Sequence, residues 1–565
     1  MNILFVNGSP RGRFSVTLQS CLYLEKRFPG HTFEYLNVGA GLDAFEKDMA
    51  PAGAAFSRAE LVIFAYPVYA FLVPSQLHRF VELTKESGLS LKGKFVTQLT
   101  TSKHFFDVTA HRFMEENFFD LGARVVHMVM KAAIEELGLD ELTIAASSLG
   151  AAHDPIADYI EEGKVVGIQT SGIRGRMGEV VSAGKLRTPA IIRSHGGRPR
   201  AIEGGEVHID FAFVAAPTSD CVGNCRGIGG KSNCGSMGYA MTDAKYADHV
   251  VVITDCLVDF PNMPASVEAI DVDAVVVVDS IGNPKKIASA AARISQNPRD
   301  LMMAENVAKV IASTPYFKEG FSFQTGVGGP SLAANLFLEK YMDERNIKMG
   351  WAIGGICGPM VELLKKGKVG KVIDVQDFDL DAVNSINQTP NHFEMSASQY
   401  ANPANKGAFV NKLDFVVLAA LEIDTGFNVN VLTGSDGVLR GAPGGHPDTA
   451  AGSKVCIIVT PLVRGRMATV CEHVVTVTTP GDCVDVLVTD YGIAVNPLRP
   501  DLVECLDNAG IPHMPIEGLK EKAYSMVGRP DDLRWEDKVV AVLEARDGTI
   551  LDVVRKIKPY TVDED

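Results

Sequence analysis

The sequence predicts an α/β protein made of one N-terminal unit and two copies of a second kind of domain. Short apolar strands rich in Val and Ile alternate with helical segments almost throughout, which is typical of parallel strands buried on both faces. The chain also repeats itself at a constant offset of 204 residues, so that Asp210 aligns with Asp414 and Asn224 with Asn428. Chance similarity of buried strand patterns is the alternative, but a register kept over several hundred residues favours duplication. Since pockets favour domain interfaces, we expect a site between the two copies.

The expected elements follow in order along the chain. Strands are expected at 2–6, 61–65 and 95–100, then at 250–254, 274–278, 416–420, 455–459 and 485–488, with a helix at 74–86. Glycine-bearing loops follow many of these strands, and open α/β sheets bind ligands at the carboxyl ends of their strands. We expect three domains, at 1–122, 123–330 and 331–565.

Composition narrows the class of protein. The 565 residues are 46% hydrophobic and 22% charged, and the net charge of −15 disfavours nucleic acid or an anionic membrane as a partner. No apolar run reaches the ~18–20 residues that span a bilayer, and the start of the chain is expected to be a first strand, not a signal peptide. Ten cysteines without a paired framework indicate a reducing cytoplasm. Cys221, Cys225 and Cys234 do not match zinc spacing, so we expect no metal site.

The first unit carries a loop suited to an anion. After the strand at 2–6, the loop at 7–12 (NGSPRG) opens a helix near 15–24, and a helix start presents backbone N–H groups and a positive dipole end. The candidate phosphate ligands are Ser9, Arg11, Ser15 and Thr17, and the aromatic planes offered to a flat ring are those of Tyr66 and Tyr69. Over 1–122 these features resemble the phosphate and flavin loops of the flavodoxin-like NAD(P)H-dependent flavin reductase family.

That resemblance implies flavin mononucleotide (FMN) as a cofactor, but one feature argues against it. A five-stranded flavodoxin needs a final strand and helix, and the candidate strand at 124–130 runs without a break into the next helical pattern. The unit is therefore expected to be truncated and to bind FMN weakly or not at all. Flavin-dependent NAD(P)H oxidoreduction is kept as the alternative function of the chain.

A dense series of motifs follows residue 125. It includes SGIRG at 171–175, RSHGGR at 193–198, FSFQTG at 321–326, GSDGVLRGA at 434–442, GGH at 444–446 and VRGR at 463–466. This series resembles the alpha subunit of bacterial citrate lyase, the citrate CoA-transferase. The resemblance implies two CoA-transferase-like (NagB/RpiA-type) α/β domains in a cytoplasmic, oligomeric complex with beta (citryl lyase) and gamma (acyl carrier) subunits. It also implies that the alpha subunit exchanges acetyl for citrate on a CoA-like prosthetic group of the gamma subunit.

The candidate site residues in these motifs are of two kinds. Arginines would bind citrate, which is a polyanion, and glycines would supply backbone N–H donors to the oxyanion that forms during thioester exchange. The arginines are Arg174, Arg198, Arg464 and Arg466, and the glycines are Gly326, Gly328, Gly437, Gly444 and Gly445. Each arginine alone could be structural, and their shared place near strand ends is what indicates a site. We expect His195, His392 and His446 to be hydrogen-bonded loop residues, and Asp220 and Asn224 to hold a turn together with their repeat partners.

The acidic candidate is Asp436. CoA-transferases that use a glutamyl thioester carry Glu in a Ser-Glu-Asn-Gly-like turn, whereas Ser435-Asp436-Gly437 is one residue shorter and holds the shorter carboxylate. The resemblance therefore implies that citrate attacks the acetyl thioester directly, through a mixed anhydride, while Asp436 orients or stabilises. A carboxylate that only holds its own turn is the alternative.

One departure from the family concerns the first transferase domain. Members of the family begin with a further segment that holds the first strand of that domain, and flavodoxin-like sequence stands in its place here. Either the fusion is natural and the flavodoxin-like unit substitutes structurally for that segment, or the chain is a chimera with a damaged first transferase domain. A sheet that lacks a central strand would expose a long unpaired edge.

Overall fold

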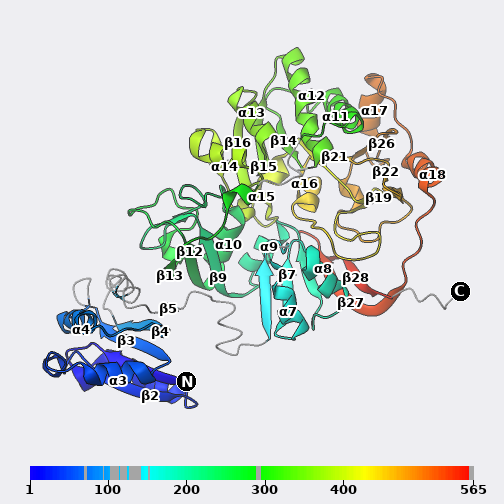
Figure 1. Cartoon of the computed structure of the whole chain (residues 1–565). Helices are drawn as coiled ribbons and strands as arrows, with labels where there is room; N and C mark the ends of the chain where they lie inside the picture. The colour runs from blue at the N-terminus through cyan, green and yellow to red at the C-terminus, as the bar shows by residue number, and fades with distance from the viewer. Residues whose placement is uncertain are drawn as a thin grey trace. The chain divides into compact units, whose positions relative to one another are not determined.

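The structure, a computed structural model, describes residues 1–68, 73–92, 94–101, 114, 117, 124–125, 141–150, 153–287, 294–326 and 328–558. The chain forms two compact units, Met1–Gly138 and Leu139–Asp565. Figure 1 shows strands and helices alternating in both units. Among the residues described, no helix is both long enough and apolar enough to cross a membrane.

The first unit is a doubly wound parallel sheet in the order β2-β1-β3-β4-β5. Its strands are β1 (Asn2–Asn7), β2 (Thr32–Asn37), β3 (Leu61–Pro67), β4 (Phe95–Thr101) and β5 (Arg124–Val125), and its helices are α1 (Val16–Arg27), α2 (Leu42–Phe45), α3 (Ala50–Arg58) and α4 (Ser75–Glu86). Side chains alternate along β1, so that Leu4 packs with Phe56 and Phe80 on one face of the sheet, while Phe5 packs with Leu18 on the other.

The fifth strand corrects the expected end of this unit. β5 pairs in parallel with β4 through Phe95 and Val96, so the strand order of a five-stranded flavodoxin is complete and extends beyond the expected boundary at residue 122. The strand could not be recognised in the sequence because no turn signal separates it from the residues that follow. The helix expected after it falls outside the described residues.

The second unit contains two halves, and the second half is built on an eight-stranded sheet. The order is β17-β16-β15-β14-β18-β21-β25-β26, parallel except for β26. The strands are β14 (Ser322–Thr325), β15 (Met349–Ile356), β16 (Val369–Asp377), β17 (His392–Glu394), β18 (Phe415–Leu418), β21 (Val455–Val459), β25 (Val486–Val488) and β26 (Ile493–Val495). The main helices are α11 (Pro298–Ser313), α12 (Gly329–Arg345), α13 (Gly358–Lys365), α14 (Leu380–Gln388), α16 (His446–Gly452), α17 (Pro500–Asn508) and α18 (Ile516–Val527), with the short α15 (Ala397–Ala401).

The first half divides its strands between two sheets. One has the order β28-β27-β8-β7-β6 and the other the order β13-β12-β9. The strands are β6 (Leu142–Ala146), β7 (Val165–Thr170), β8 (Ala190–Arg193), β9 (Ile209–Ala216), β12 (Ala247–Thr254), β13 (Ala274–Val277), β27 (Trp535–Glu544) and β28 (Ile550–Ile557). The helices are α7 (Ile156–Glu161), α8 (Gly175–Ser182), α9 (Gly197–Glu203) and α10 (Gly238–Tyr246).

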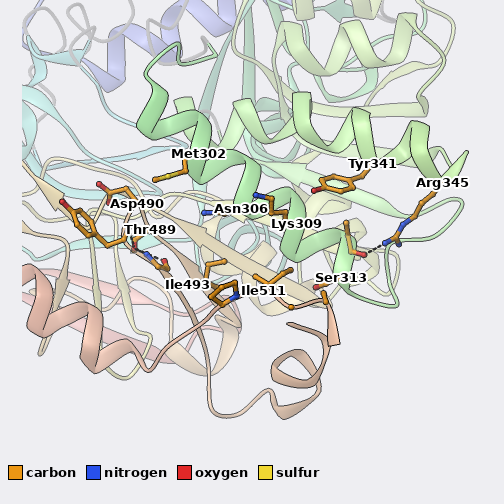
Figure 2. A pocket seen from close by; sticks show the side chains of 16 residues that line it. Met302, Asn306, Lys309, Ser313, Tyr341, Arg345, Thr489, Asp490, Ile493 and Ile511 are labelled. Carbon is orange, nitrogen blue, oxygen red and sulfur yellow. Dashed lines mark hydrogen bonds between the residues drawn. The ribbon is translucent and has the colours of Figure 1, made fainter. Parts of the chain in front are cut away.

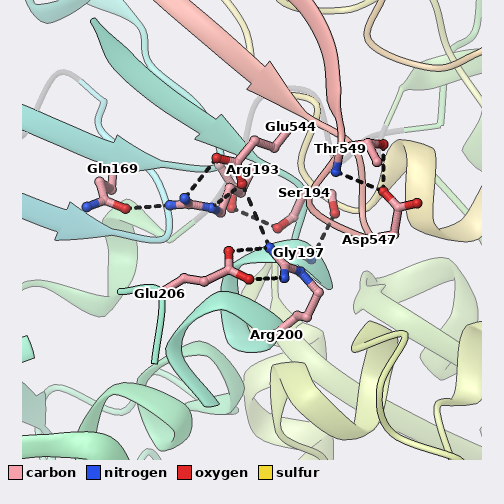
Figure 3. Close-up of polar contacts among 10 residues, drawn as sticks. Gln169, Arg193, Ser194, Gly197, Arg200, Glu206, Glu544, Asp547 and Thr549 are labelled. Carbon is pink, nitrogen blue, oxygen red and sulfur yellow. Dashed lines mark hydrogen bonds and ion pairs between the residues drawn. The ribbon is translucent and has the colours of Figure 1, made fainter. Parts of the chain in front are cut away.

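The strand pairing crosses the domain boundaries expected from the sequence. β14 precedes the expected boundary at residue 330 but lies between β15 and β18 in the sheet of the second half. β27 follows the second half in sequence but pairs in parallel with β8. There Glu544 forms a bidentate ion pair with Arg193, and Arg193 also donates a hydrogen bond to Gln169 (Figure 3). The two halves are therefore not two consecutive segments of the chain.

The structure confirms the duplication at the offset of 204 residues. β9 pairs with β12 as β18 pairs with β21, and the two-stranded pair β10 (Thr218–Ser219) with β11 (Cys225–Arg226) recurs as β19 (Glu422–Asp424) with β20 (Val429–Asn430). Asp220 accepts from the backbone N–H of Asn224 at 3.0 Å, and Asp424 accepts from that of Asn428 at 2.9 Å. These residues hold matching turns, as expected.

The counterpart of β14 is not found among the described strands of the first half. By the repeat, that strand would stand between β6 and β9, which are edges of separate sheets. On β9 the side chains of Phe211 and Phe213 are 57% and 44% exposed, whereas Phe415, the repeat partner of Phe211, is fully buried. Among the described strands of the first half, none therefore stands between β6 and β9.

Candidate functional site

The candidate site lies where β14 and β18 end side by side. The chain runs from β14 through β15 and β16 to β17 on one side, and from β18 through β21 to β25 on the other, so this point is the topological switch at which open α/β sheets bind ligands. Gly326 donates its N–H to the carbonyl oxygen of Val417 at 2.8 Å. A Cβ added to Gly328 would lie 3.7 Å from that of Ala419. Two predicted glycines thus bring the backbone after β14 close to the end of β18.

His446 closes the far side of this switch point. It begins α16, and its Nε2 donates to the carbonyl oxygen of Ala419 at 3.0 Å, while Nδ1 is 2.7 Å from the hydroxyl of Thr479. Burial lowers the pKa of His446 to about 4, although the hydrogen bond to Ala419 opposes the shift. The imidazole is therefore neutral at ordinary pH, and it holds the loop as the sequence predicted.

The loop before His446 crosses to the first half. Ile173 donates its N–H to the carbonyl oxygen of Gly441 at 3.0 Å, and His195 donates to that of Gly444 at 2.9 Å. Gly444 has a positive φ of 51°, which favours glycine. These hydrogen bonds join the two halves beside the switch point, and we refer to this junction as the crevice.

Arg198 approaches this crevice from α9. Its Nη1 is 2.7 Å from Oδ1 of Asp243 on α10, while its Nη2 is buried and has no hydrogen-bond partner within the described structure. Burial lowers the pKa of the nearby His195 to about 3, and the charge of Arg198 adds to that shift. The hydroxyl of Tyr239 is 2.6 Å from Nδ1 of His195. One nitrogen of this buried guanidinium is thus without a hydrogen-bond partner among the described residues.

Three residues that support the crevice were missed by the sequence reasoning. Asp448 accepts from Ser194 Oγ at 2.8 Å, and burial raises its pKa to about 6. A Cβ on Gly445 would lie 2.6 Å from the hydroxyl of Tyr400. The hydroxyl of Tyr239 meets His195, and that of Tyr400 accepts from Gln324 Nε2 at 2.8 Å, so each acquires its role from a partner that is distant in the chain. The sequence signal for Asp448 was its place in the turn of α16 that begins at His446.

The remaining predicted arginines are Arg464 and Arg466 on one hairpin and Arg174 before α8. Arg464, on the hairpin of β22 (Val463–Arg464) and β23 (Met467–Ala468), donates from Nη2 to the carbonyl oxygen of Ala420 at 3.1 Å. Burial lowers the pKa of Arg464, and the charge of Arg299 adds to this shift. Arg464 is nevertheless exposed to solvent, as are Arg174 and Arg466.

Asp436 is 51% exposed in its side chain and lies 2.6 Å from Arg440 Nη2. Partial burial alone would raise the pKa of Asp436, but hydrogen bonds from Arg440 and from the N–H of Val438 outweigh it and lower the pKa. A Cβ on Gly437 would lie 2.4 Å from Ile557, so this glycine packs its turn against β28. Asp436 therefore stabilises its own turn in this structure, which is the alternative that the sequence left open.

In the first unit, the predicted phosphate loop is ordered by its own polar groups. Asn7 Oδ1 accepts from the N–H of Ser9 at 3.2 Å, and Ser15 Oγ accepts from that of Leu18 at 2.9 Å. Thr17 Oγ1 is 2.6 Å from Thr101 Oγ1. The other predicted residues are the exposed Arg11, the buried Tyr66, whose hydroxyl donates to Gln98, and Tyr69, which lies outside the described residues.

A cavity of about 690 Å³ lies elsewhere, between α11, α12 and the ends of β25 and β26 (Figure 2). Its lining includes Lys309, Tyr341 and Arg345, and Arg345 already donates to the carbonyl oxygen of Ala312 at 2.7 Å. None of the residues predicted from the sequence lines this cavity. We therefore place the site at the switch point, where the chemistry of the side chains is, and not at this cavity.

The duplicated halves and the crevice between them define a protein of the CoA-transferase-like α/β class. The family model for the alpha subunit of citrate lyase matches residues 107–557, and the chain belongs to the citrate lyase alpha subunit family. A model of the flavodoxin-like fold matches residues 1–158.

Individual relatives agree. The citrate lyase alpha chain of Haemophilus influenzae is 52% identical over 437 residues, which are 77% of this chain and 87% of the relative. That of Klebsiella pneumoniae is 51% identical over the same length, with 86% of the relative covered. Among solved structures, the putative alpha subunit of citrate lyase from Streptococcus mutans, in complex with citrate, is 52% identical with a TM-score of 0.74, covering 75% of this chain and 84% of that one. A Pseudomonas malonate decarboxylase, at 17% identity and a TM-score of 0.52 over 70% and 79% of the two chains, shares the fold.

Proposed function

We propose that this chain is a citrate CoA-transferase, which converts an acetyl thioester and citrate into a citryl thioester and acetate. The observation that carries the proposal is the citrate complex of the Streptococcus mutans relative, which is 52% identical over 75% of this chain. In the proposed assembly the thioester is carried on a CoA-like prosthetic group of an acyl carrier (gamma) subunit, and a beta subunit cleaves the citryl product. The complex is proposed to be cytoplasmic.

The charges around the crevice support a polyanionic substrate. Arg198 offers a buried Nη2 without a hydrogen-bond partner in the described structure, and Arg464 reaches the same switch point through Ala420. Because His195 and His446 are neutral, with pKa values of about 3 and 4, they donate or accept hydrogen bonds but add no positive charge. Arginine is suited to binding a carboxylate through two parallel hydrogen bonds.

The proposed reaction proceeds without a covalent intermediate on the protein. One citrate carboxylate attacks the acetyl thioester carbonyl, which forms a mixed anhydride and releases the thiolate. The thiolate then attacks the citryl carbonyl of the anhydride and releases acetate. Asp436 is held by Arg440 and is proposed to orient its turn, while the backbone at Gly444, Gly445 and Gly328 is proposed to stabilise the oxyanion.

The direct test is to incubate the purified chain with acetyl-CoA and citrate and to look for citryl-CoA by mass spectrometry. Arg198→Lys keeps the charge but loses the planar fork, and a lost charge-assisted contact costs roughly 1.5–3 kcal/mol, so the apparent citrate constant should rise about ten- to a hundredfold. The matched control is Arg176→Lys, because Arg176 is exposed and paired with Asp158 on the surface.

Two outcomes would count against the proposal. A folded sample that forms no citryl-CoA at saturating citrate would exclude the activity for this chain. An unchanged citrate constant in Arg198→Lys would move the anion site to Arg464, which would be replaced next.

FMN binding by the first unit is a second candidate function. The observation that favours it is the complete order of five strands, which includes β5. Of the two elements whose absence led us to expect an unformed pocket, the last strand is present as β5, and the helix after it lies outside the described residues. Flavin-dependent NAD(P)H oxidoreduction is thus kept as an independent activity of residues 1–138.

A further inference from the structure

A bulge in β16 places two carboxylates on one face of the sheet. Asp374 pairs with Gly354 of β15, but the next pair is Gln376 with Gly355, so Val375 is an extra residue. Side chains alternate along a regular strand, and residues three apart point to opposite faces. The extra residue at the bulge shifts this alternation by one position. The side chains of Asp374 and Asp377 therefore point to the same face of the sheet, and both residues are buried.

An imidazole from the neighbouring strand completes the group. His392 begins β17, and its Nε2 is 3.1 Å from Oδ2 of Asp374 while its Nδ1 is 3.0 Å from the hydroxyl of Ser385. The side chains of His392 and Asp374 are 0% exposed. One possible ligand atom from each of Asp374, Asp377 and His392 lies within 4.8 Å of the other two.

Two oxygens of this group are buried without a partner. Oδ1 of Asp374 and Oδ1 of Asp377 have no hydrogen-bond donor within the described structure, and the two residues are 0% and 5% exposed. Buried carboxylate oxygens are normally satisfied, because burying a charge without a partner is very costly. The two carboxyls are close enough to hydrogen-bond to each other, and burial raises the pKa of Asp374 to about 7 and that of Asp377 to about 10. Either a shared proton or a bound cation must therefore satisfy these oxygens.

The charges facing the group are of one sign. Glu394 lies on the same strand as His392 and accepts from Ser266 Oγ at 2.7 Å, and the charge of Asp379 also acts on Asp374. The ion pairs of the described residues give Asp374 no Lys or Arg partner, only His392, and give Asp377 none. A small cation would supply the missing positive charge.

The first half closes this group from the other side. Ser236 donates its N–H to Oδ2 of Asp377 at 2.7 Å and its hydroxyl to the carbonyl oxygen of Asp374 at 3.1 Å. Gly235 has a positive φ of 80°, and a Cβ there would lie 1.7 Å from Asp377. This loop of the first half thus contacts β16 of the second half directly at the two carboxylate residues.

We propose that Asp374, Asp377 and His392 bind one divalent first-row metal ion, such as Zn²⁺, at the junction of the two halves. Two carboxylate oxygens and one imidazole nitrogen are a common donor set for such ions, at about 2.0–2.2 Å from the metal. Binding replaces the hydrogen bond between His392 and Asp374 with metal bonds, and the ligands move inward from their present spacing. The ion fastens the loop at Ser236 to the second half and takes no part in acyl transfer.

The test uses the full chain, stripped with a chelator and then incubated with Zn²⁺, passed through gel filtration and measured by elemental mass spectrometry. We expect one equivalent of Zn²⁺ per chain and a higher midpoint of thermal unfolding than for the stripped protein. His392→Gln and Asp377→Asn should each retain no Zn²⁺. The matched control is His208→Gln, because His208 belongs to an exposed cluster with Asp210 and Asp248 that also resembles a metal site but lacks buried, unpartnered oxygens.

A second measurement uses only the wild-type chain, so it does not depend on whether a variant folds. Co²⁺ added to the stripped wild-type chain should give the visible absorption of a protein-bound ion, and Zn²⁺ should displace it. The proposal is overturned if the wild-type chain retains no Zn²⁺ and shows no Co²⁺ band, since the carboxylates would then be held by a shared proton. It is equally overturned if Asp377→Asn retains a full equivalent, or if His208→Gln alone loses it.

Discussion

Replacing Glu544 by Gln should destabilise the second unit strongly. In Figure 3 Glu544 reaches Arg193 from the end of β27, with Nε to Oε2 at 2.6 Å and Nη2 to Oε1 at 2.9 Å. The two side chains are only 8% and 15% exposed. Removing one partner of a buried pair leaves the other charge uncompensated and costs about 3–5 kcal/mol. With a urea dependence of about 3 kcal/mol/M, the upper value for small proteins, the midpoint of unfolding would fall by about 1–1.7 M, and by proportionally less with the steeper slope of a larger unit.

The two tryptophans give a local readout of this change. Trp535 stands on β27 and Trp351 on β15, so a Trp351→Phe background makes Trp535 the only tryptophan in the chain. We expect its urea transition to move to lower concentration in Glu544→Gln, and the double variant Arg193→Met with Glu544→Leu to recover most of the loss, because it leaves no buried charge unpaired.

The control for this prediction is Glu206→Gln. Glu206 is paired with Arg200, but its side chain is 50% exposed, and exposed pairs contribute about 0–1 kcal/mol. If Glu544→Gln shifted the midpoint no more than Glu206→Gln does, the pair at β27 would contribute like a surface pair and the reasoning from its burial would be refuted.

Three further outcomes are expected. Borohydride in the presence of acetyl-CoA should not inactivate the chain, because Asp436 is held by Arg440 and forms no thioester; rapid loss of activity with modification of a carboxylate would show the covalent route. His446 has a pKa of about 4 in the folded chain against 6.5 ordinarily, so below pH 6.5 the unfolded chain takes up a proton that the native chain does not. The free energy of unfolding should therefore fall as the pH drops, and this residue contributes about 2 kcal/mol of the loss at pH 5. The urea midpoints measured at pH 7.5 and pH 5 should differ less in His446→Gln than in the wild-type chain. Equal differences in both proteins would contradict the lowered pKa of His446. Micromolar FMN should lose its fluorescence on binding the first unit, and Arg11→Ala should weaken this at least tenfold while the control Arg27→Ala does not; no quenching by the wild-type chain would leave residues 1–138 as a scaffold.

The duplication could be predicted because its signal is local. Asp220 and Asn224 stand four apart and recur 204 residues later, and each pair holds the same tight turn. Glycines at strand ends likewise predicted the switch point, since Gly326 and Gly444 allow close backbone approach there. Tight turns and strand ends can be predicted because they depend on residue types at neighbouring positions.

The rest depended on partners that are distant in the chain. β27 carries no sign that it pairs with β8, since its burial pattern fits many sheets. Asp448 and Arg198 acquire their roles from Ser194 and Asp243, which only the folded chain brings near. The bulge at Val375 could not be predicted either, because one extra residue leaves the composition of an apolar strand unchanged. Contacts between residues far apart in the chain, and local irregularities of a strand, are therefore what sequence reasoning missed.

The position of β27 also has a consequence for how the protein is made. Glu544 and Arg193 are 351 residues apart, and ribosomes add about 5–20 residues per second, so β8 waits roughly 20–70 s before its neighbour emerges. During that time the edge of β8 is unpaired and open to association with other nascent chains. The first half cannot be completed as it is synthesised, and a messenger truncated before residue 535 would yield a chain with this edge permanently exposed. Production of this protein should therefore depend on chaperones that shield the early half until the last strands arrive.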